Sequence, residues 1–251
     1  MRLDLSQKVA LVTGSSKGIG FAIAQSLHAE GCQVVLNGRS AEDLIKSTNL
    51  LSGAVGIVGD VTNPLVAHQI VNEVIDRLGR LDILICSVGS GRSVPPGEET
   101  VEEWQRMFAL NLWSATNCVE AATSALEETK GVIVCISSIC GLEVIPSAPV
   151  TYSAAKAALH AYIKGIARPL GKQGVRINAV APGNILFDSS VWSLKIEQDA
   201  SAVQAMLAQD VALGKLGSPA DVASLVTYLV SPLSGFVSGA VWTIDGGQVH
   251  A

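Results

Sequence analysis

Short apolar runs rich in valine and isoleucine alternate along the chain with segments of helical periodicity. The runs cover residues 8–13, 33–37, 54–58, 81–86, 131–137, 174–180 and 240–244. The helical segments cover residues 18–29, 41–51, 64–79, 100–127, 150–170 and 219–231. Because the runs are apolar at successive positions, they predict strands that are covered on both faces. Their alternation with helices predicts one α/β domain over residues 1–251, a doubly wound parallel sheet of about seven strands with helices on both faces.

Residues 184–214 interrupt this alternation. They contain no strand signal, and residues 200–213 predict at most a short helix. A connection of this length in a compact domain is usually functional. We therefore expect the segment to form a lid or substrate loop.

The composition narrows the partners and the compartment. The 251 residues carry a net charge of −5, only 4% are aromatic, and no basic run stands out, which argues against nucleic acid. No apolar run approaches the ~20 residues that span a bilayer, and the first eight residues lack the layout of a secretion signal. The five cysteines are odd in number and form no C-x-x-C pair, which favours free thiols in the cytoplasm.

The stretch TGSSKGIG, residues 13–20, joins the first predicted strand to the first predicted helix. In a doubly wound sheet this turn faces the crevice in which dinucleotides bind. Gly14, Gly18 and Gly20 permit a tight turn, close backbone approach and close helix packing, with a pyrophosphate at the helix N-terminus. The turn therefore predicts a dinucleotide site of the Rossmann type.

The same stretch also matches the G-x-S-x-G elbow of a serine hydrolase. That elbow normally follows a later strand, and it requires an acid and then a histidine downstream of the serine. Asp245 and His250 satisfy that order only formally, at the far end of the chain. The hydrolase remains a remote alternative.

Tyr152 and Lys156 lie one helical turn apart, so the phenol and the ammonium share one face of a predicted helix. A neighbouring ammonium stabilises the phenolate, and lowering the phenol pKa by about three units requires roughly 4 kcal/mol of differential interaction. That change makes Tyr152 a usable general acid or base. An isolated pair of this kind is more often an ordinary feature of an amphipathic helix. Here, however, the preceding strand ends at Ser137 and Ser138, which places a third polar group at the same edge of the sheet.

With these motifs in order, the chain resembles the short-chain dehydrogenase/reductase family over essentially its whole length, including members that reduce 3-oxoacyl-[acyl-carrier-protein]. The matching positions are Thr13–Gly20, Asp60-Val61, Asn111 in ALNLWSAT, Ser138 in ISSICG, Tyr152 with Lys156, Pro182-Gly183 in INAVAPGNI, GKLGSPADVASLVTYLVSP, and WTIDGG. The resemblance implies that hydride moves between a nicotinamide and a substrate carbon while Tyr152 exchanges a proton with the substrate oxygen. It also implies a homotetramer or homodimer.

The resemblance assigns further roles residue by residue. Ser138 would hydrogen-bond the substrate carbonyl, Lys156 would hold the nicotinamide ribose and tune Tyr152, and Asn111 would position a water. The implied cofactor contacts are Gly14, Ser16, Lys17, Gly18, Ile19, Gly20, Arg39, Asp60, Val61, Gly89, Tyr152, Lys156, Pro182, Gly183 and Ile185. No metal is implied, and the four histidines, His28, His68, His160 and His250, have no ligand spacing. A non-catalytic nucleotide-binding protein would need a broken catalytic position, and none is broken.

The end of the second predicted strand favours NADP(H) over NAD(H). NAD-preferring sheets usually present a carboxylate there to the ribose hydroxyls. This chain instead has Arg39, whose fork of donors suits a 2′-phosphate, and Lys17 adds charge from the glycine turn. NAD(H) remains possible if Arg39 is solvated and Asn37 hydrogen-bonds a plain ribose.

Two positions depart from the family pattern. Cys86-Ser87-Val88-Gly89 replaces N-N-A-G after the fourth strand, and Phe187 stands where a threonine commonly follows Pro-Gly, so Ser189 or Ser190 is expected to substitute. Arg92 is a candidate for a substrate carboxylate or phosphate, although such an arginine is more often solvated. Neither departure touches the four catalytic positions.

The substrate is expected to be a free small ketone or alcohol, with a 3-oxoacyl group on acyl carrier protein as the alternative. Carrier proteins are acidic and bind best to basic surfaces. The segments 127–130 and 171–173, expected beside the pocket mouth, carry little net positive charge. Apolar loop residues around the lid are expected mostly to pack it against the body: Val144, Ile145, Pro146, Val191, Trp192 and Leu194.

Overall fold

A parallel sheet forms the centre of the computed structural model, which describes residues 3–146 and 148–249. The strands are β1 (Val9–Thr13), β2 (Gln33–Gly38), β3 (Val55–Val58), β4 (Ile83–Cys86), β5 (Val132–Ile136), β6 (Arg176–Pro182) and β7 (Val241–Ile244). The seven strands lie in the order β3-β2-β1-β4-β5-β6-β7, so the winding reverses between β1 and β4. The doubly wound parallel sheet predicted from the sequence is confirmed.

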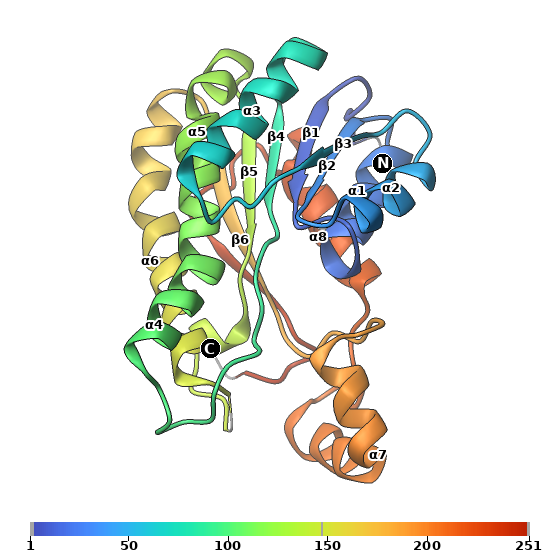
Figure 1. Ribbon diagram of the computed structural model, residues 1–251, viewed down its shortest axis with the longest axis vertical. Coiled ribbons are helices and arrows are strands. Elements are labelled where there is room, and N and C mark those ends of the chain that lie inside the picture. Colours follow the sequence, from blue (N-terminus) through green and yellow to red (C-terminus); the bar gives the residue numbers. More distant parts are fainter. Residues whose placement is uncertain (1–2, 147, 250–251) are drawn as a thin grey trace.

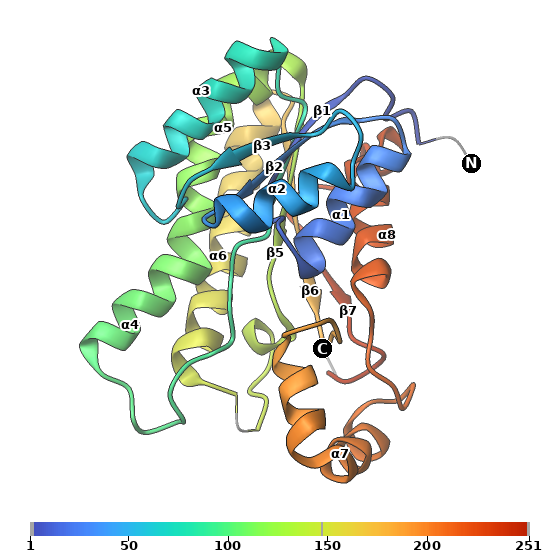
Figure 2. The same cartoon turned by 45° about the vertical axis from the view of Figure 1, so that its right-hand side comes forward.

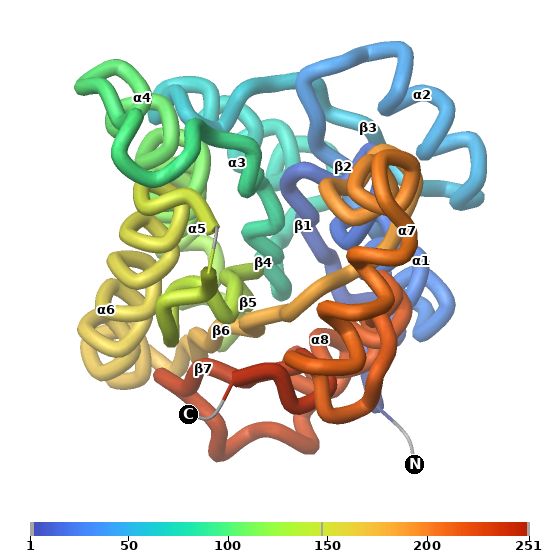
Figure 3. The backbone as a smooth tube through the Cα atoms, turned by 90° about the horizontal axis from the view of Figure 1, so that it is seen from below, coloured from blue at the N-terminus to red at the C-terminus, as the bar shows by residue number. Residues whose placement is uncertain are grey.

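Helices cover both faces of the sheet (Figure 1; Figure 3). One face carries α1 (Gly18–Ala29), α2 (Ala41–Asn49) and α8 (Pro219–Val230), and the other carries α3 (Pro64–Leu78), α5 (Ser114–Thr129) and α6 (Val150–Lys172). Several helices begin where the sequence supplies a cap. Asn63 accepts a hydrogen bond from the Leu65 amide, and Ser218 forms a capping box with Asp221.

Each face of the sheet has its own hydrophobic core, because neighbouring residues of a strand point to opposite sides. Leu11 packs into the core that contains Val119 of α5 and Ile163 of α6. Its neighbour Val12 packs into the other core, which contains Ile23 of α1 and other residues of α1 and α8. Burial on both sides explains why the strands read as continuous apolar runs.

Two predicted helices differ from the structure. The segment 100–127 is not one helix but α4 (Val101–Phe108), a π-helical turn (Ala109–Trp113) and α5. All three pieces have nearly helical spacing, so periodicity does not separate them.

In the interrupting segment, α7 runs from Val191 to Asp210 with a kink at Asp199, and it is longer than the predicted 200–213 helix. The Ser190 hydroxyl caps its start by accepting from the Ser193 amide, and Trp192 and Ile196 pack against a small separate core at Val203. Figure 2 shows α7 apart from the helices that cover the sheet. Among the described residues, no helix is both long and apolar enough to cross a bilayer.

Candidate active site

A cavity of about 1360 Å³ lies at the edge of the sheet where the strands end. Its walls come from the residues that follow β1 to β6 and from the α7 segment. All fifteen predicted cofactor contacts line it, and so do Ser138, Tyr152 and Lys156. This is the topological switch point at which open α/β sheets bind ligands. The structure therefore brings the predicted cofactor contacts and three of the four predicted catalytic residues to one cavity.

The glycine turn has the shape that a pyrophosphate site needs. Gly14 and Gly18 have φ values of 62° and 60°, which strongly favour glycine. A side chain at Gly20 would collide with the Gly14 carbonyl oxygen, so the helix packs directly on the turn. The open backbone at the start of α1 fits a dinucleotide phosphate.

Beyond the turn, Arg39 and Asp60 form an ion pair with 3.6 Å between Nη1 and Oδ2. Burial acts to raise the pKa of Asp60, but hydrogen bonds from Thr62 and the charge of Arg39 outweigh it, and the pKa is lowered. The Arg39 side chain is 72% exposed and faces the cavity, so its donors can reach a ligand. Asn37 is buried and gives its amide hydrogens to the carbonyls of Ile57 and Gly59, which leaves only its oxygen for a ribose.

Ser138, Tyr152 and Lys156 converge from the end of β5 and the first turns of α6. Lys156 is 3% exposed, and its Nζ donates to the Ile136 carbonyl at 2.9 Å. The same nitrogen lies 5.9 Å from the centre of the Tyr152 ring. The ammonium is therefore held between the strand end and the phenol.

The expected lowering of the Tyr152 pKa by Lys156 is not what the structure shows. Burial raises the pKa of Tyr152 to about 12, although the Ser138 hydroxyl acts in the opposite direction. Burial also lowers the pKa of Lys156 to about 8. The prediction was wrong because it counted the attraction between the two groups and left out the loss of water around both.

Asn111 lies in the π-helical turn, and it is not among the described residues that line the cavity. Its Oδ1 accepts from the Ser90 amide at 3.0 Å, and its Nδ2 donates to the carbonyls of Ser90 and Met107 at 3.1 Å. A π-turn in an α-helix is often found at a functional site. Here the turn directs an amide side chain onto the loop after β4, so the side chain holds that loop rather than facing the cavity.

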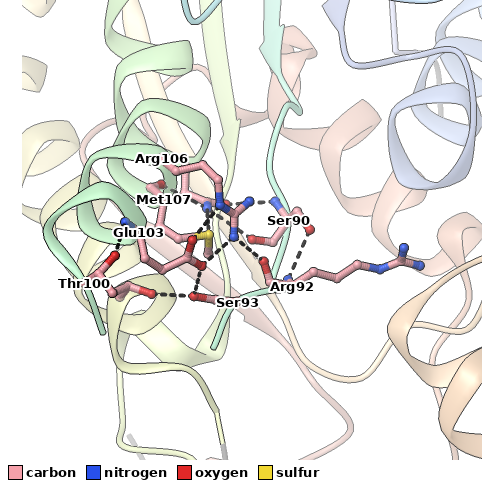
Figure 4. A network of polar contacts seen from close by, with 9 residues as sticks. Ser90, Arg92, Ser93, Thr100, Glu103, Arg106 and Met107 are labelled. Carbon is pink, nitrogen blue, oxygen red and sulfur yellow. Dashed lines mark hydrogen bonds and ion pairs between the residues drawn. The ribbon is translucent and has the colours of Figure 1, made fainter. Parts of the chain in front are cut away.

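The loop after β4 is held by a further network that the sequence analysis missed (Figure 4). The Ser93 hydroxyl donates to Glu103 at 2.6 Å and lies 2.8 Å from the hydroxyl of Thr151, the residue before Tyr152. Arg106 pairs with Glu103 and also donates to the Arg92 carbonyl. These hydrogen bonds lower the pKa of Glu103 to about 2. Of these contacts, only the pair of Glu103 with Arg106 has a spacing that the sequence reveals, i and i+3, because the other partners of Glu103 and Arg106 are distant in the chain.

The departure at residues 86–89 leaves the close approach intact. A Cβ at Gly89 would lie 2.9 Å from Asn111 Oδ1 and 3.1 Å from Lys156 Nζ. Glycine is thus required because two predicted catalytic side chains pack against it.

The departure at Phe187 changes the wall of the cavity beside the glycine turn. The Phe187 ring covers the glycine turn, and a Cβ at Gly18 would lie 2.8 Å from its Cε2. Of the two serines expected to replace the threonine, Ser190 caps α7 by accepting from the Ser193 amide, and both Ser189 and Ser190 line the cavity. Arg92 is exposed, as expected, and its Nη2 donates to the Ser189 carbonyl at 2.7 Å, which joins the β4 loop to the α7 segment.

Two further expectations about the cavity mouth are wrong. Residues 127–130 and 171–173 end α5 and α6 beside the starts of β5 and β6, so they lie at the opposite edge of the sheet. The charged residues that line the cavity come from other segments, and they include Arg92, Lys195, Glu143 and Asp210. Five of the six apolar loop residues line the cavity rather than only packing the lid, and Leu194 is the exception.

The hydrolase alternative gains no support from the geometry. Ser16 is the serine of the elbow pattern, and no described hydrogen bond joins its hydroxyl to a histidine. The Asp245 carboxylate accepts the amides of Gly247, Gln248 and Val249, and His250 lies outside the described residues. Within residues 3–146 and 148–249, no cluster of three histidine, cysteine or acidic side chains could hold a metal.

Known proteins resemble the chain over almost its whole length. A family model described as enoyl-(acyl carrier protein) reductase matches residues 14–249. A 3-oxoacyl-[acyl-carrier-protein] reductase of Synechocystis sp. is 32% identical, with 98% of each chain covered. A cyclohexanol dehydrogenase of Rhodococcus sp. is 33% identical, with 99% of this chain and 98% of the relative covered. The structure of L-sorbose reductase from Gluconobacter frateurii complexed with NADPH and L-sorbose is 27% identical, with both chains fully covered and a TM-score of 0.93.

Proposed function

The chain belongs to the short-chain dehydrogenase/reductase family, and on that premise we propose that it interconverts a ketone and a secondary alcohol with a nicotinamide dinucleotide. The observation that carries the proposal is the single cavity in which Ser138, Tyr152 and Lys156 face the same space as the glycine turn. Three residue types that handle a carbonyl oxygen thus lie beside a phosphate-binding backbone.

In the proposed reaction Tyr152 is the proton donor to the carbonyl oxygen in reduction and the proton acceptor in oxidation. Ser138 donates a hydrogen bond to the same oxygen, and Lys156 holds the nicotinamide ribose. The bound nicotinamide ring supplies or accepts the hydride. Because burial raises the pKa of Tyr152 to about 12, the phenol carries its proton at neutral pH, and giving up that proton depends on stabilisation of the phenolate by the Ser138 hydroxyl and the bound ligands. Asn111 supports the site through Ser90 and Gly89, and a water relay through it remains part of the proposal.

We favour NADP(H) as the cofactor, with NAD(H) as the alternative. Arg39 and Lys17 supply positive charge at the cavity wall where a 2′-phosphate would lie, and no free carboxylate replaces them. Asp60 is already paired with Arg39, so phosphate binding would redirect part of that guanidinium. The similar L-sorbose reductase was solved with NADPH.

A free small molecule is the favoured substrate, with the residue 184–214 segment as its lid. The Arg92–Ser189 hydrogen bond joins the β4 loop to the α7 segment beside the cavity, which favours a compact ligand. An acidic carrier protein would bind best to a basic surface, and the acidic residues Glu143 and Asp210 line the cavity together with Arg92 and Lys195. The similarity to a 3-oxoacyl-[acyl-carrier-protein] reductase keeps that activity as the second candidate.

We also propose a homotetramer, or a homodimer, in a reducing compartment such as the cytoplasm. Exposed apolar side chains lie at the starts of α5 and α6 and before β7, where Trp113, Val150 and Phe236 are 45%, 43% and 106% exposed. All five cysteines are free, and four are buried. The mass of the native protein in solution tests the assembly.

The decisive experiment is titration of the purified protein with NADPH and with NADH, followed by nicotinamide fluorescence. Cyclohexanone, L-sorbose and acetoacetyl-acyl carrier protein then serve as probe substrates for oxidation of the reduced cofactor. Tighter NADPH binding with turnover of a free ketone supports the proposal. Turnover of the carrier-bound probe alone supports the second candidate, and the absence of binding by either nucleotide overturns both.

A further inference from the structure

The segment Ser137–Gly141 carries Ser138 from the end of β5 towards α6. Its first residue is tied to the sheet, because the Ser137 amide donates to the Val180 carbonyl at 2.7 Å. The Ser138 hydroxyl accepts from the Cys140 amide at 3.1 Å and caps a short 3-10 helix. Catalysis also requires that the segment be fixed against α6, which carries Tyr152.

His160 makes that connection from α6. It lies one turn beyond Lys156 on the same helix face and is 4% exposed. Its Nε2 lies 2.6 Å from Ser137 Oγ, and its Nδ1 lies 3.2 Å from the Gly141 carbonyl oxygen. One imidazole therefore bonds to both ends of the segment.

The two partners fix the protonation of the ring. A carbonyl oxygen can only accept, so Nδ1 carries the hydrogen, and Nε2 accepts from the Ser137 hydroxyl. Burial lowers the pKa of His160 to about 4, and the charges of Lys156 and Lys164 act in the same direction. The ring therefore stays neutral, in one tautomer, at neutral pH.

Close packing reinforces the two hydrogen bonds. A Cβ at Gly141 would lie 2.8 Å from His160 Cε1 and 2.7 Å from the Lys156 carbonyl carbon. Glycine thus lets the end of the segment rest directly on α6, beside the turn that carries Lys156.

We infer that His160 is a positioning residue, which holds Ser137 and Gly141 so that Ser138 is kept in place beside Tyr152. It is not among the described residues that line the cavity, so it acts on the reacting groups only through the segment. A serine–histidine contact also occurs in hydrolases, where a carboxylate commonly orients the histidine. Here a backbone carbonyl takes that place, and a pKa of about 4 makes the imidazole a weak base.

The test uses His160→Leu, which removes both hydrogen bonds, and His160→Gln, which keeps one donor and one acceptor. His68→Leu is the matched control. His68 is a half-exposed histidine on α3 that contacts Glu120 on α5, and it does not line the cavity. The first readout needs no substrate. Cys140 lies within the segment and is the one cysteine of the five that is not buried, so its alkylation by iodoacetamide reports segment mobility.

We expect His160→Leu to raise the Cys140 alkylation rate about fivefold, as local opening becomes easier. The catalytic role rests on the proposed function, and for it we expect turnover of the probe ketone to fall about tenfold through misplacement of Ser138. The dissociation constant for NADPH should change less than about twofold, which a general loss of structure would not allow. His160→Gln should restore most of the slow alkylation and most of the turnover, and His68→Leu should change neither.

An unchanged Cys140 alkylation rate in His160→Leu overturns the inference. A rate in His160→Gln that rises as much as in His160→Leu also overturns it. If His160→Leu does not fold, Ser137→Ala removes only the bond to Nε2, and it must still raise Cys140 alkylation. If the wild-type protein turns over no probe, the proposed function fails, while the alkylation series still decides whether His160 holds the segment.

Discussion

The two edges of the parallel sheet both contain charged side chains, but these side chains differ in how many hydrogen-bond partners they have. At the edge where the strands begin, the Asp82 carboxylate accepts from the Val9 amide, Lys8 and Arg80. Arg176 donates to the carbonyls of Leu229, Ser231 and Val237. Each charge there meets several partners of opposite polarity, so this edge is built for stability.

At the edge where the strands end, charges are buried with few partners. Among the described residues, Lys156 donates one hydrogen bond, to the neutral carbonyl of Ile136, and Tyr152 loses water without gaining a full charge partner. Both pKa values move in the direction that burial dictates. Perturbed groups beside a cavity are typical of functional sites. Mutations at the two edges should therefore separate turnover from stability.

The largest expected effect is at the cavity edge. Tyr152→Phe should lower turnover at least about 100-fold, because a general acid or base contributes about 10² to 10⁴. NADPH binding and the thermal midpoint should change little, since only one hydroxyl is lost. Steady-state kinetics and fluorescence titration measure these quantities. Tyr162→Phe, on the same helix but packed against the core, is the control, and equal activity of both variants would remove Tyr152 from its role.

At the opposite edge, Asp82→Ala should lower the free energy of unfolding by about 2 kcal/mol, because the buried Val9 amide loses a charged acceptor. Turnover per folded molecule should not change. Hydrogen bonds from Arg80, Val9 and Lys8 outweigh burial and lower the pKa of Asp82, so its contribution is present above the ordinary aspartate pKa and is lost as the pH falls. Urea unfolding at pH 7 and pH 3 measures this difference. Asp82→Asn keeps an acceptor for Val9 and should cost less, and a loss of turnover in either variant would contradict the separation of the two edges.

A smaller effect is expected at the far wall of the cavity. Arg39→Ala should weaken NADPH binding about tenfold and NADH binding less than about twofold, because we propose that the guanidinium contacts the 2′-phosphate, which NADH lacks. Parallel fluorescence titrations give both constants. Arg77→Ala removes another exposed arginine, one that pairs with Glu73 on α3, and it should leave both constants unchanged. Equal losses for the two nucleotides in Arg39→Ala would refute the phosphate assignment.

The sequence predicted the sheet and the glycine turn that lines the cavity, because both depend on short-range patterns. Apolar runs and glycines carry their own conformational preferences, and parallel strands bring their ends to one edge. The π-turn at Asn111 was missed because it differs from an α-helix by one extra residue in a hydrogen-bonded ring, which leaves the apolar spacing nearly unchanged.

The rest of the site depends on contacts between distant segments. Arg92 is exposed, as expected, but its hydrogen bond to Ser189 could not be predicted, because the two residues are 97 positions apart. The Tyr152 pKa was misjudged because spacing reveals the neighbouring charge and not the depth of burial. The segments 127–130 and 171–173 were assigned to the wrong edge of the sheet. Each lies at the end of a helix that leads into the start of the next strand, so it belongs to the edge where the strands begin.

The smallest predicted effect concerns the charge of Lys156. Burial lowers the pKa of Lys156 to about 8, so the ammonium that we propose holds the ribose is lost as the pH rises through that value. The rate of ketone reduction at subsaturating NADPH should therefore fall to about half its neutral value near pH 8. Tyr152, with a pKa of about 12, remains a proton donor there, and so it does not produce this decline. Lys156→Arg should show a lower rate overall but no decline in this range, since a guanidinium stays charged. A wild-type decline that persists unchanged in Lys156→Arg would assign it to another group, and the buried ammonium would then have no part in the pH dependence of the cavity edge.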